Sequence, residues 1–317
     1  MSAMRGALLL SIALVIIAGC SSAPDTPETV TEAKDRAAEY AEFGNRYYQQ
    51  GNYSQALQFF ELALRENTSV DNRRGIAQSY NSIGTVYLAT GDIQTAESSF
   101  TSAYTIAQDL QDERLLLQSG THLGEVALRR GDNELAMEFF DQALERESND
   151  TEPADLAILY HNIATAHSRY EEFEQAEEYL RRAMAINEEG RHLPELASNH
   201  YMLASVYSRQ DRYDEALAEA GTALEIDKQI ENSVGIAADL KALGLISRRR
   251  GDQEQALDYL KRSLQVTATI GLVPEAQALL EQLVSLSREL GRTEESERYA
   301  GQLERLQSGQ QPREDRE

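Results

Sequence analysis

The sequence predicts an all-α protein, an α-solenoid of about seven helical hairpins stacked in tandem. Three observations predict this fold. Small residues recur at intervals of 40 positions in three columns, and a column of helix-breaking residues lies between them. Ala, Glu, Leu, Gln and Arg dominate after residue 35, only 6 residues are Pro, and no long β-branched run alternates with period two.

The bulk composition limits the possible partners. Of 317 residues, 41% are apolar, which is typical of a folded chain. Acidic residues outnumber basic ones by 53 to 30, and the net charge of −23 argues against nucleic acid and anionic lipid headgroups as partners. The single cysteine, Cys20, excludes an intramolecular disulfide and a zinc site built on several thiolates.

The first element, residues 1–19, has the form of a secretory signal. Its apolar run, residues 7–18, is too short to cross a bilayer and has the length of a signal-peptide core. The run ends on Ile17–Cys20, which resembles the lipobox of bacterial lipoproteins. This resemblance implies a cleaved lipoprotein signal peptide and a lipidated Cys20, with an ordinary signal peptide as the simpler alternative. By the same resemblance, Ser21 permits sorting to the outer membrane, where the protein would face the periplasm.

The second element, residues 20–36, carries the lipidated cysteine and is rich in Ser, Thr, Pro and acidic residues. Such a composition buries little apolar surface, so it predicts a flexible tether. The chain beyond it would then work close to a membrane surface, held by the acyl chains on the cysteine.

The third element, residues 37–306, contains the seven periods. The first small column is Gly44, Gly84, Gly124, Ala164, Ala204, Gly244 and Val284. The second is Ala56, Ala96, Ala136, Ala176, Ala216, Ala256 and Ser296, and the third runs from Ala63 to Leu303. The breaker column is Gly51, Gly91, Gly131, Glu171, Asp211, Gly251 and Gly291. Glycine in the left-handed conformation ends a helix, and Asn or Asp after it caps the next, so each period reads as helix, turn, helix.

These columns resemble the tetratricopeptide repeat, as Gly84, Tyr87, Ala96, Phe100 and Ala103 illustrate in the second period. The usual period of that family is about 34 residues, and the proline that normally closes the second helix is absent here. We therefore expect the second helix to run on for another turn. The seventh period has lost most of its small residues and is expected to be a capping hairpin. Residues 307–317 are polar and are expected to be a disordered tail.

The resemblance implies a concave groove lined by the first helix of each hairpin. Two lines of residues should face it. One is Ala41, Asn81, Thr121, His161, Tyr201, Lys241 and Glu281. The other is Asn45, Thr85, Glu125, Thr165, Ser205, Leu245 and Ser285. Short polar side chains at these positions suit the backbone of a bound peptide or partner helix.

A column of arginines stands out in so acidic a chain: Arg129, Arg169, Arg209 and Arg249. The simpler interpretation is that each cation suits the C-terminal end of its own helix and is exposed to solvent. The sharper hypothesis is a ladder along one edge of the groove that pairs with carboxylates of a bound segment or C-terminus.

No catalytic motif is found, and the sequence predicts no enzyme, no cofactor, no metal site and no small-molecule substrate. His122, His161 and His200 lack the ligand spacing of a metal site and are expected to be packing or groove residues. Carboxylate runs are expected to form solvated helix faces.

The leading functional hypothesis is a membrane-anchored scaffold that recruits other proteins in the bacterial periplasm. Lipoproteins with such repeats include adaptors of envelope enzymes, and a role in pilus, secretin or outer-membrane assembly is a narrower, less favoured version. The alternative is a regulatory sensor whose superhelix changes pitch when a peptide or small ligand binds.

Overall fold

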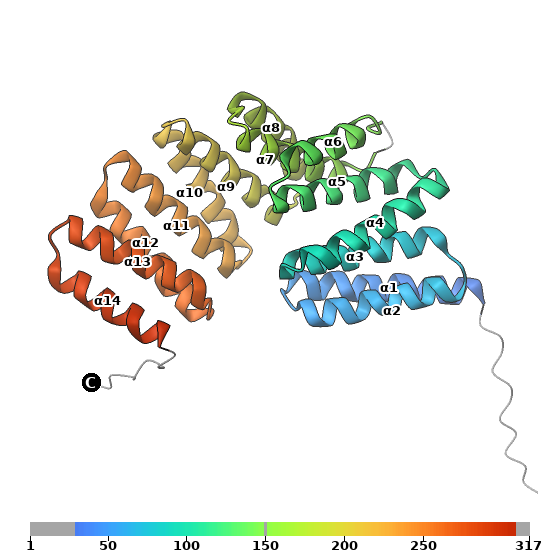
Figure 1. Ribbon diagram of the computed structural model, residues 1–317, viewed down its shortest axis with the longest axis horizontal. Helices are drawn as coiled ribbons and strands as arrows, with labels where there is room; N and C mark the ends of the chain where they lie inside the picture. The colour runs from blue at the N-terminus through green and yellow to red at the C-terminus, as the bar shows by residue number, and fades with distance from the viewer. Residues whose placement is uncertain (1–28, 149–150, 309–317) are drawn as a thin grey trace, which may run out of the picture.

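The computed structural model describes residues 29–148 and 151–308, and within them the chain is entirely helical apart from turns (Figure 1). The first helices of the hairpins are α1 (Val30–Gln49), α3 (Arg73–Thr90), α5 (Glu113–Arg130), α7 (Pro153–Arg169), α9 (Leu193–Arg209), α11 (Ser233–Arg250) and α13 (Val273–Glu289). The second helices are α2 (Tyr53–Ser69), α4 (Ile93–Leu110), α6 (Asn133–Leu144), α8 (Phe173–Gly190), α10 (Tyr213–Gln229), α12 (Gln253–Thr269) and α14 (Thr293–Gln307). The predicted all-α array of seven hairpins is confirmed.

The turns between consecutive helices account for the regular period of 40 residues. Every residue of the breaker column is left-handed, including Glu171 at φ 63° and Asp211 at φ 59°. The same conformation recurs between hairpins, for example at Gln111 (φ 52°) and Glu231 (φ 56°). Except after the third hairpin, both turns of a period therefore have the same design, so the helices other than α6 have nearly equal lengths. As expected, most second helices run through the place of the family's proline; α6 is the exception, ending at Leu144.

The core is a stack of matched small and large residues. The second small column is fully buried from Ala56 to Ala256. In the first column, Gly84 faces Phe100 and Gly124 faces Phe140 so closely that a Cβ on either glycine would lie within 3 Å of the ring. Where the column has Ala164, the facing residue is the smaller Leu180, which is fully buried.

The array begins earlier than the sequence predicted. Residues 30–36, assigned to the tether, form the first turns of α1. Thr29 and Glu32 form a capping box, with the Thr29 N–H donating to the Glu32 carboxylate at 2.9 Å, and Ala33 is fully buried. The local polar composition hid this start because the cap itself is polar. The predicted signal peptide (residues 1–19), Cys20 and residues 309–317 lie outside the described residues.

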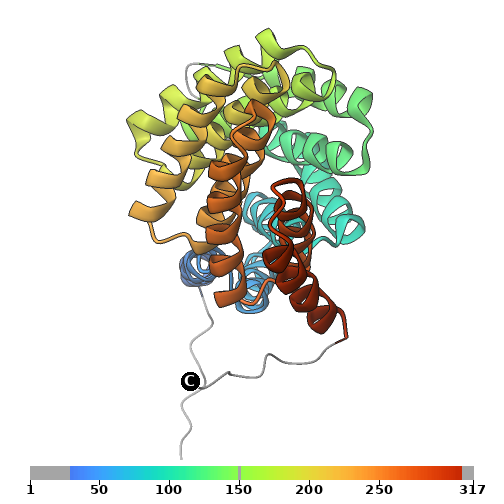
Figure 2. The same cartoon turned by 90° about the vertical axis from the view of Figure 1, so that its left-hand side faces the viewer.

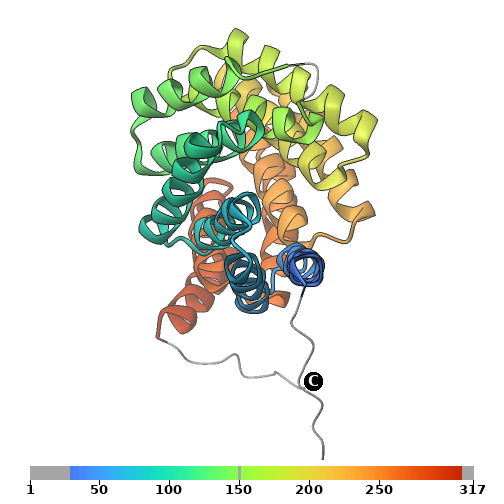
Figure 3. The ribbon, with the colours of Figure 1, turned by 90° about the vertical axis from the view of Figure 1, so that its right-hand side faces the viewer.

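The hairpins form two layers of helices. From α1 to α11, each first helix contacts the next first helix, whereas the second helices make their main contacts with first helices. The first helices therefore form the inner layer, and the stack follows an arch from α1 over α7 to α14 (Figure 1). Figures 2 and 3 show that the arch also winds into a coil.

The seventh hairpin closes the array, as predicted. Of α14, only Ser296 and Tyr299 are buried, and Tyr299 packs in a cluster with Leu283 and Leu286 of α13. Leu303 and Leu306 of α14 pack partly buried against the same cluster, and most of its other side chains are polar and exposed. Among the described helices, none combines the length and the apolar character that a membrane span requires.

Candidate binding groove

The inner layer contains a pocket between two consecutive first helices, α9 and α11. Its volume is about 630 Å³. Tyr201 and Ser205 line it from α9, and Ala242, Leu245 and Ile246 line it from α11. Three predicted groove positions, Tyr201, Ser205 and Leu245, thus meet here over a largely apolar floor. Tyr201 is 40% exposed, so its ring is available to a guest.

Three arginines complete the pocket: Arg209 from the end of α9, and Arg248 and Arg249 from the end of α11. No aspartate or glutamate lines it, although the chain carries 53 acidic residues. Arg248 is held by α13, where it donates to Gln282 at 3.0 Å and pairs with Glu289 at 2.5 Å. Arg209 is ion-paired as well, with Glu171 at 3.2 Å, so the positive charge that the pocket offers a guest comes mainly from Arg249.

Arg249 contributes charge that no acid in the described part of the chain neutralises. Its guanidinium donates to the backbone oxygen and the hydroxyl of Ser208, both at 3.4 Å. Both acceptors are neutral, and a guanidinium has five N–H donors. Donors therefore remain for a carboxylate guest.

The arginine column has a structural role that its period alone did not reveal. Arg169 donates to the backbone oxygen of Leu128, and Arg209 to that of Ser168, so each arginine reaches the last turn of the preceding first helix. Each of these carbonyls already accepts a hydrogen bond from the turn that ends its helix, Leu128 O from Gly131 N–H at 3.0 Å and Ser168 O from Glu171 N–H at 3.1 Å, and the arginine adds a second, charged donor. Arg249 repeats the contact at Ser208. Arg129 instead pairs with Glu125 of its own helix at 3.4 Å.

Of the predicted partner-binding arginine edge, the structure therefore brings Arg209 and Arg249 into one pocket. Arg169, one hairpin away, bonds to the Leu128 carbonyl of the preceding hairpin, and Arg129 pairs within its own helix. The simpler interpretation describes all four arginines, since each is exposed and lies in the last turn of its own helix. What it did not predict is the additional bond from Arg169, Arg209 and Arg249 to a carbonyl of the neighbouring hairpin.

The predicted polar lines are less open than expected. Thr121 is 2% exposed and its hydroxyl donates to Leu117 O at 2.7 Å, so it is a packing residue and cannot contact a guest. Thr85 and Thr165 are half-buried and donate in the same way to Asn81 O and His161 O. A threonine in a helix satisfies its hydroxyl on the preceding turn, which the spacing argument overlooked.

The other members of these lines differ among themselves. Asn81 is 7% exposed, and neither atom of its amide has a hydrogen-bond partner. His161 bonds to Asn199 at 2.8 Å, and burial lowers its pKa to about 4, so it is neutral at ordinary pH. Asn45 is exposed and Lys241 is half-buried. The line is therefore a mixture of packing residues and accessible ones.

His122 and His200, expected as packing or groove residues, both contact neighbouring side chains. His122 stacks on Phe100 with 4.6 Å between ring centroids, and burial lowers its pKa to about 4. His200 pairs with Glu219 at 2.6 Å. Across residues 29–148 and 151–308, no three His, Cys, Asp or Glu side chains converge on a possible metal position.

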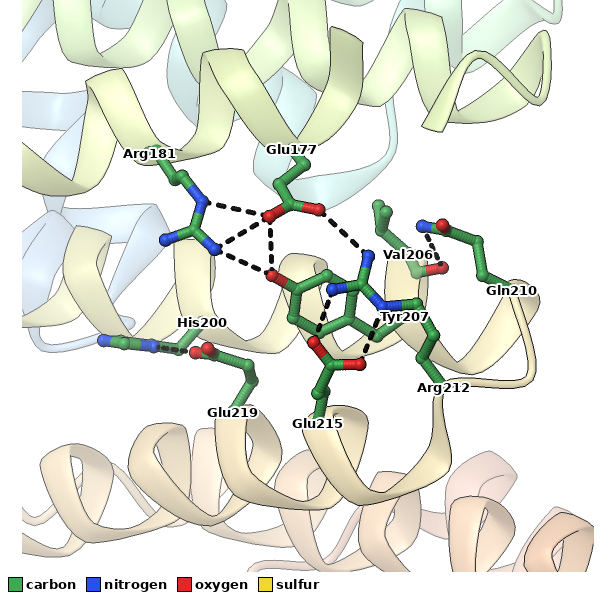
Figure 4. Close-up of polar contacts among 9 residues, drawn as sticks. All are labelled: Glu177, Arg181, His200, Val206, Tyr207, Gln210, Arg212, Glu215 and Glu219. Atoms are coloured by element: carbon green, nitrogen blue, oxygen red, sulfur yellow. Dashed lines mark hydrogen bonds and ion pairs between the residues drawn. The ribbon is translucent and has the colours of Figure 1, made fainter. Parts of the chain in front are cut away.

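One polar network was not predicted from the sequence (Figure 4). Glu177 of α8 accepts hydrogen bonds from Arg181 at 2.8 Å, from the Tyr207 hydroxyl at 2.9 Å and from Arg212 at 3.1 Å. Burial opposes ionisation of Glu177, but these three donors outweigh it and lower its pKa. Arg212 also pairs with Glu215 of α10. The network joins α8, α9 and α10, and only the Glu177–Arg181 spacing could have suggested it.

Comparison with known proteins gives the family and the fold. The tetratricopeptide repeat family model matches residues 36–109, 114–189 and 195–269, more than half of the chain. The structure is similar to a Rap protein complexed with competence and sporulation factor, with a TM-score of 0.66, 18% identity, and coverage of 87% of this chain and 76% of that one. A search of curated proteins gives no significant match.

Two further solved structures have the same architecture. The Rap conjugation gene regulator of plasmid pLS20, in complex with a peptide, has a TM-score of 0.63 and 19% identity, and the match covers 92% of this chain and 81% of that one. A signal-transduction ATPase with a tetratricopeptide repeat sensor, from Pyrococcus horikoshii, has a TM-score of 0.63 and 14% identity over 87% of this chain and 42% of that one. At these identities the likeness shows the fold.

Proposed function

This chain belongs to the tetratricopeptide repeat family, and from that membership we propose that it is a scaffold which holds an acidic segment of a partner protein. The observation that carries the proposal is the pocket between α9 and α11. It combines the guanidinium groups of Arg209, Arg248 and Arg249 with an apolar floor, and no acidic residue lines it. A guest that suits it is an extended peptide in which carboxylates alternate with apolar side chains. The proposal assigns no catalytic step to the chain.

The proposed place of action is the bacterial envelope, with the scaffold anchored by lipid on Cys20 and facing the periplasm. The support is the lipobox-like Ile17–Cys20 sequence at the end of a short apolar run. A Cys20→Ser variant should lose palmitate labelling and move from the membrane fraction to the periplasmic fraction. Unchanged labelling and fractionation would refute the anchor and leave the binding proposal untouched.

Binding is tested directly with two synthetic peptides, one alternating Leu with Glu and the other alternating Leu with Gln. Fluorescence anisotropy of the purified chain should give at least about tenfold tighter binding of the Glu peptide, because charge-assisted hydrogen bonds are the stronger kind. Arg249→Glu should abolish this preference. Ala242→Trp, which fills the pocket and leaves the charge unchanged, should weaken binding of both peptides.

The matched control is Arg262→Glu, which makes the same charge change on α12, outside the pocket. Among the described residues, Arg262 forms its ion pair with Asp258 of its own helix, at 3.5 Å, and its guanidinium lies over the Tyr259 ring. This variant should bind the Glu peptide like the unaltered chain. Equal affinity for the two peptides, or equal loss in Arg249→Glu and Arg262→Glu, would overturn the proposal.

A second candidate is a sensor that changes shape when a peptide binds. It is favoured by the two similar Rap structures, which were solved with competence and sporulation factor and with a peptide. Small-angle X-ray scattering separates the candidates: a sensor should change its radius of gyration when the Glu peptide saturates it. A scaffold should keep its radius unchanged.

A further inference from the structure

Two aspartates face each other at the junction between the fifth and sixth hairpins. Asp227 lies on α10 and is 4% exposed, and Asp239 lies on α11 and is 1% exposed. They occupy the same places as Asn187 and Asn199, which hydrogen-bond at 2.7 Å at the preceding junction, and the two carboxyl groups interact with each other in the same way. Asn232, in the turn between the helices, donates to Asp227 Oδ1 at 3.0 Å, while Asp239 Oδ2 has no partner.

The corresponding places at other junctions hold neutral side chains. Between the fourth and fifth hairpins, Asn187 donates to Asn199 at 2.7 Å, and between the first and second, Asn67 donates to Ser79 at 3.3 Å. Each of these pairs includes a donor. Two ionised carboxylates have none, so the aspartate pair can form its hydrogen bond only if one member carries a proton.

The surroundings do not compensate a second negative charge. Across α9, the ionisable group that interacts with the pair is Tyr201, whose pKa is raised by its own burial and then by the charge of Asp239. No cation acts on either carboxyl within the described ranges. Lys228, next to Asp227, is paired with Glu225 at 2.6 Å. Lys241, two residues after Asp239, is not among the groups that shift either pKa.

On the other side of α11, the α12 side chain that hydrogen-bonds to this part of the helix is neutral. Ser263 of α12 is fully buried and donates to Ala237 O at 2.7 Å, and Thr267 is 1% exposed. Burial, then the charge of Asp227 and the hydrogen bond to it, raise the pKa of Asp239 to about 8. Burial also raises the pKa of Asp227, against the hydrogen bonds that it accepts.

We propose that Asp227 and Asp239 share a single proton, and that its loss loosens the packing of α10 against α11, so that this junction weakens as the pH rises. The folded chain holds a proton that the unfolded chain releases near pH 4. The stabilisation is therefore complete below that pH, decreases as pH rises, and is gone once the pH passes about 8. The aspartate pair lies beside the pocket, since Tyr201 contributes to the pocket and interacts with Asp239.

The test is thermal unfolding of the full chain at pH 5, 7 and 9. The variant Asp227→Asn/Asp239→Asn reproduces the neutral pair found at Asn187 and Asn199, so the site should accept it. Its Tm should vary less with pH than that of the unaltered chain, and at pH 9 it should be the higher of the two. Asp239→Asn alone leaves one carboxylate with an amide donor and should behave in the same way.

The matched control is Asp141→Asn/Asp258→Asn, which makes the same two substitutions at exposed carboxylates, and at pH 9 it makes the same change in net charge. It should keep the pH dependence of the unaltered chain. A carbon-13 NMR titration of the Asp239 carboxyl gives a direct reading, with a midpoint near pH 8 expected. A midpoint near pH 4, or equal pH dependence in the unaltered chain and the Asp227→Asn/Asp239→Asn variant, would overturn the proposal. Neither measurement depends on peptide binding.

Discussion

At the scale of the residue, one periodic arginine column performs different tasks. Arg169, Arg209 and Arg249 each cap a backbone carbonyl of the preceding first helix, so they hold neighbouring hairpins together. Arg129 makes only an ion pair within its own helix. Position in the repeat fixes where each arginine leaves its helix, and the acceptors nearby decide which atoms its guanidinium contacts. Bracing and guest binding are compatible in Arg249, because a guanidinium has donors to spare.

This division of tasks predicts unequal costs of truncation. Arg169→Ala should lower the free energy of unfolding by about 1–2 kcal/mol, because the Asn133 amide oxygen loses its charged donor and the Leu128 carbonyl, which also accepts the Gly131 N–H, loses its second one. Arg129→Ala should cost less than about 0.5 kcal/mol, as expected for an exposed pair within one helix. Urea unfolding of both variants provides the comparison. Equal losses would show that the contact across hairpins contributes nothing.

At the scale of the element, the hairpins tolerate different residues because volume is conserved across each one. Gly124 of α5 faces Phe140 of α6, whereas Ala164 of α7 faces Leu180 of α8. Glycine is poor within a helix, and its presence here is explained by the ring that occupies the space of a side chain. The small residues of the first column and the large residues that face them therefore vary together.

The pairing can be tested as a double-mutant cycle. In Gly124→Ala the new Cβ would lie 2.3 Å from Phe140 Cε1, so the variant should lose about 1–3 kcal/mol despite the better helix propensity of alanine. Phe140→Leu should lose about 1–2 kcal/mol by leaving a cavity. The double variant recreates the Ala164–Leu180 combination and should lose at least about 1 kcal/mol less than the sum. Additive losses in urea unfolding would contradict the pairing.

These elements also show what sequence could and could not predict. The columns at Gly84 and Ala96 predicted the helices, the turns and the cap, because steric fit repeats with the period. The start of α1 was missed, since a capping box such as that of Thr29 reads locally as polar linker. The groove lines were only partly right because Thr121 satisfies its hydroxyl on its own helix. Contacts between hairpins, such as that of Asp227 with Asp239, depend on register that no local pattern encodes.

At the scale of the whole molecule, the charge is distributed unevenly. A net charge of −23 spreads over a stack in which each hairpin contacts mainly its neighbours. Like charges along such a stack repel one another and oppose compaction. The pocket between α9 and α11 is the reverse, with three arginines and no acid lining it. An acidic exterior around an electropositive pocket would repel acidic chains in general and favour one that reaches the inner face.

The thermal stability of the chain and its affinity for the Glu peptide should change in opposite directions when salt is added. Raising sodium chloride from about 0.02 to about 0.5 M shortens the Debye length from roughly 20 Å to below 5 Å, so the repulsion among surface carboxylates weakens. The Tm of the chain should therefore rise. Over the same range the affinity for the alternating Leu and Glu peptide should fall, because its carboxylates lose attraction to Arg209 and Arg249, while affinity for the Gln peptide should stay level. A Tm that falls with salt would mean that local ion pairs, such as that of Arg212 with Glu215, outweigh the net repulsion. An affinity for the Glu peptide that does not fall would mean that the arginines serve only to brace the stack.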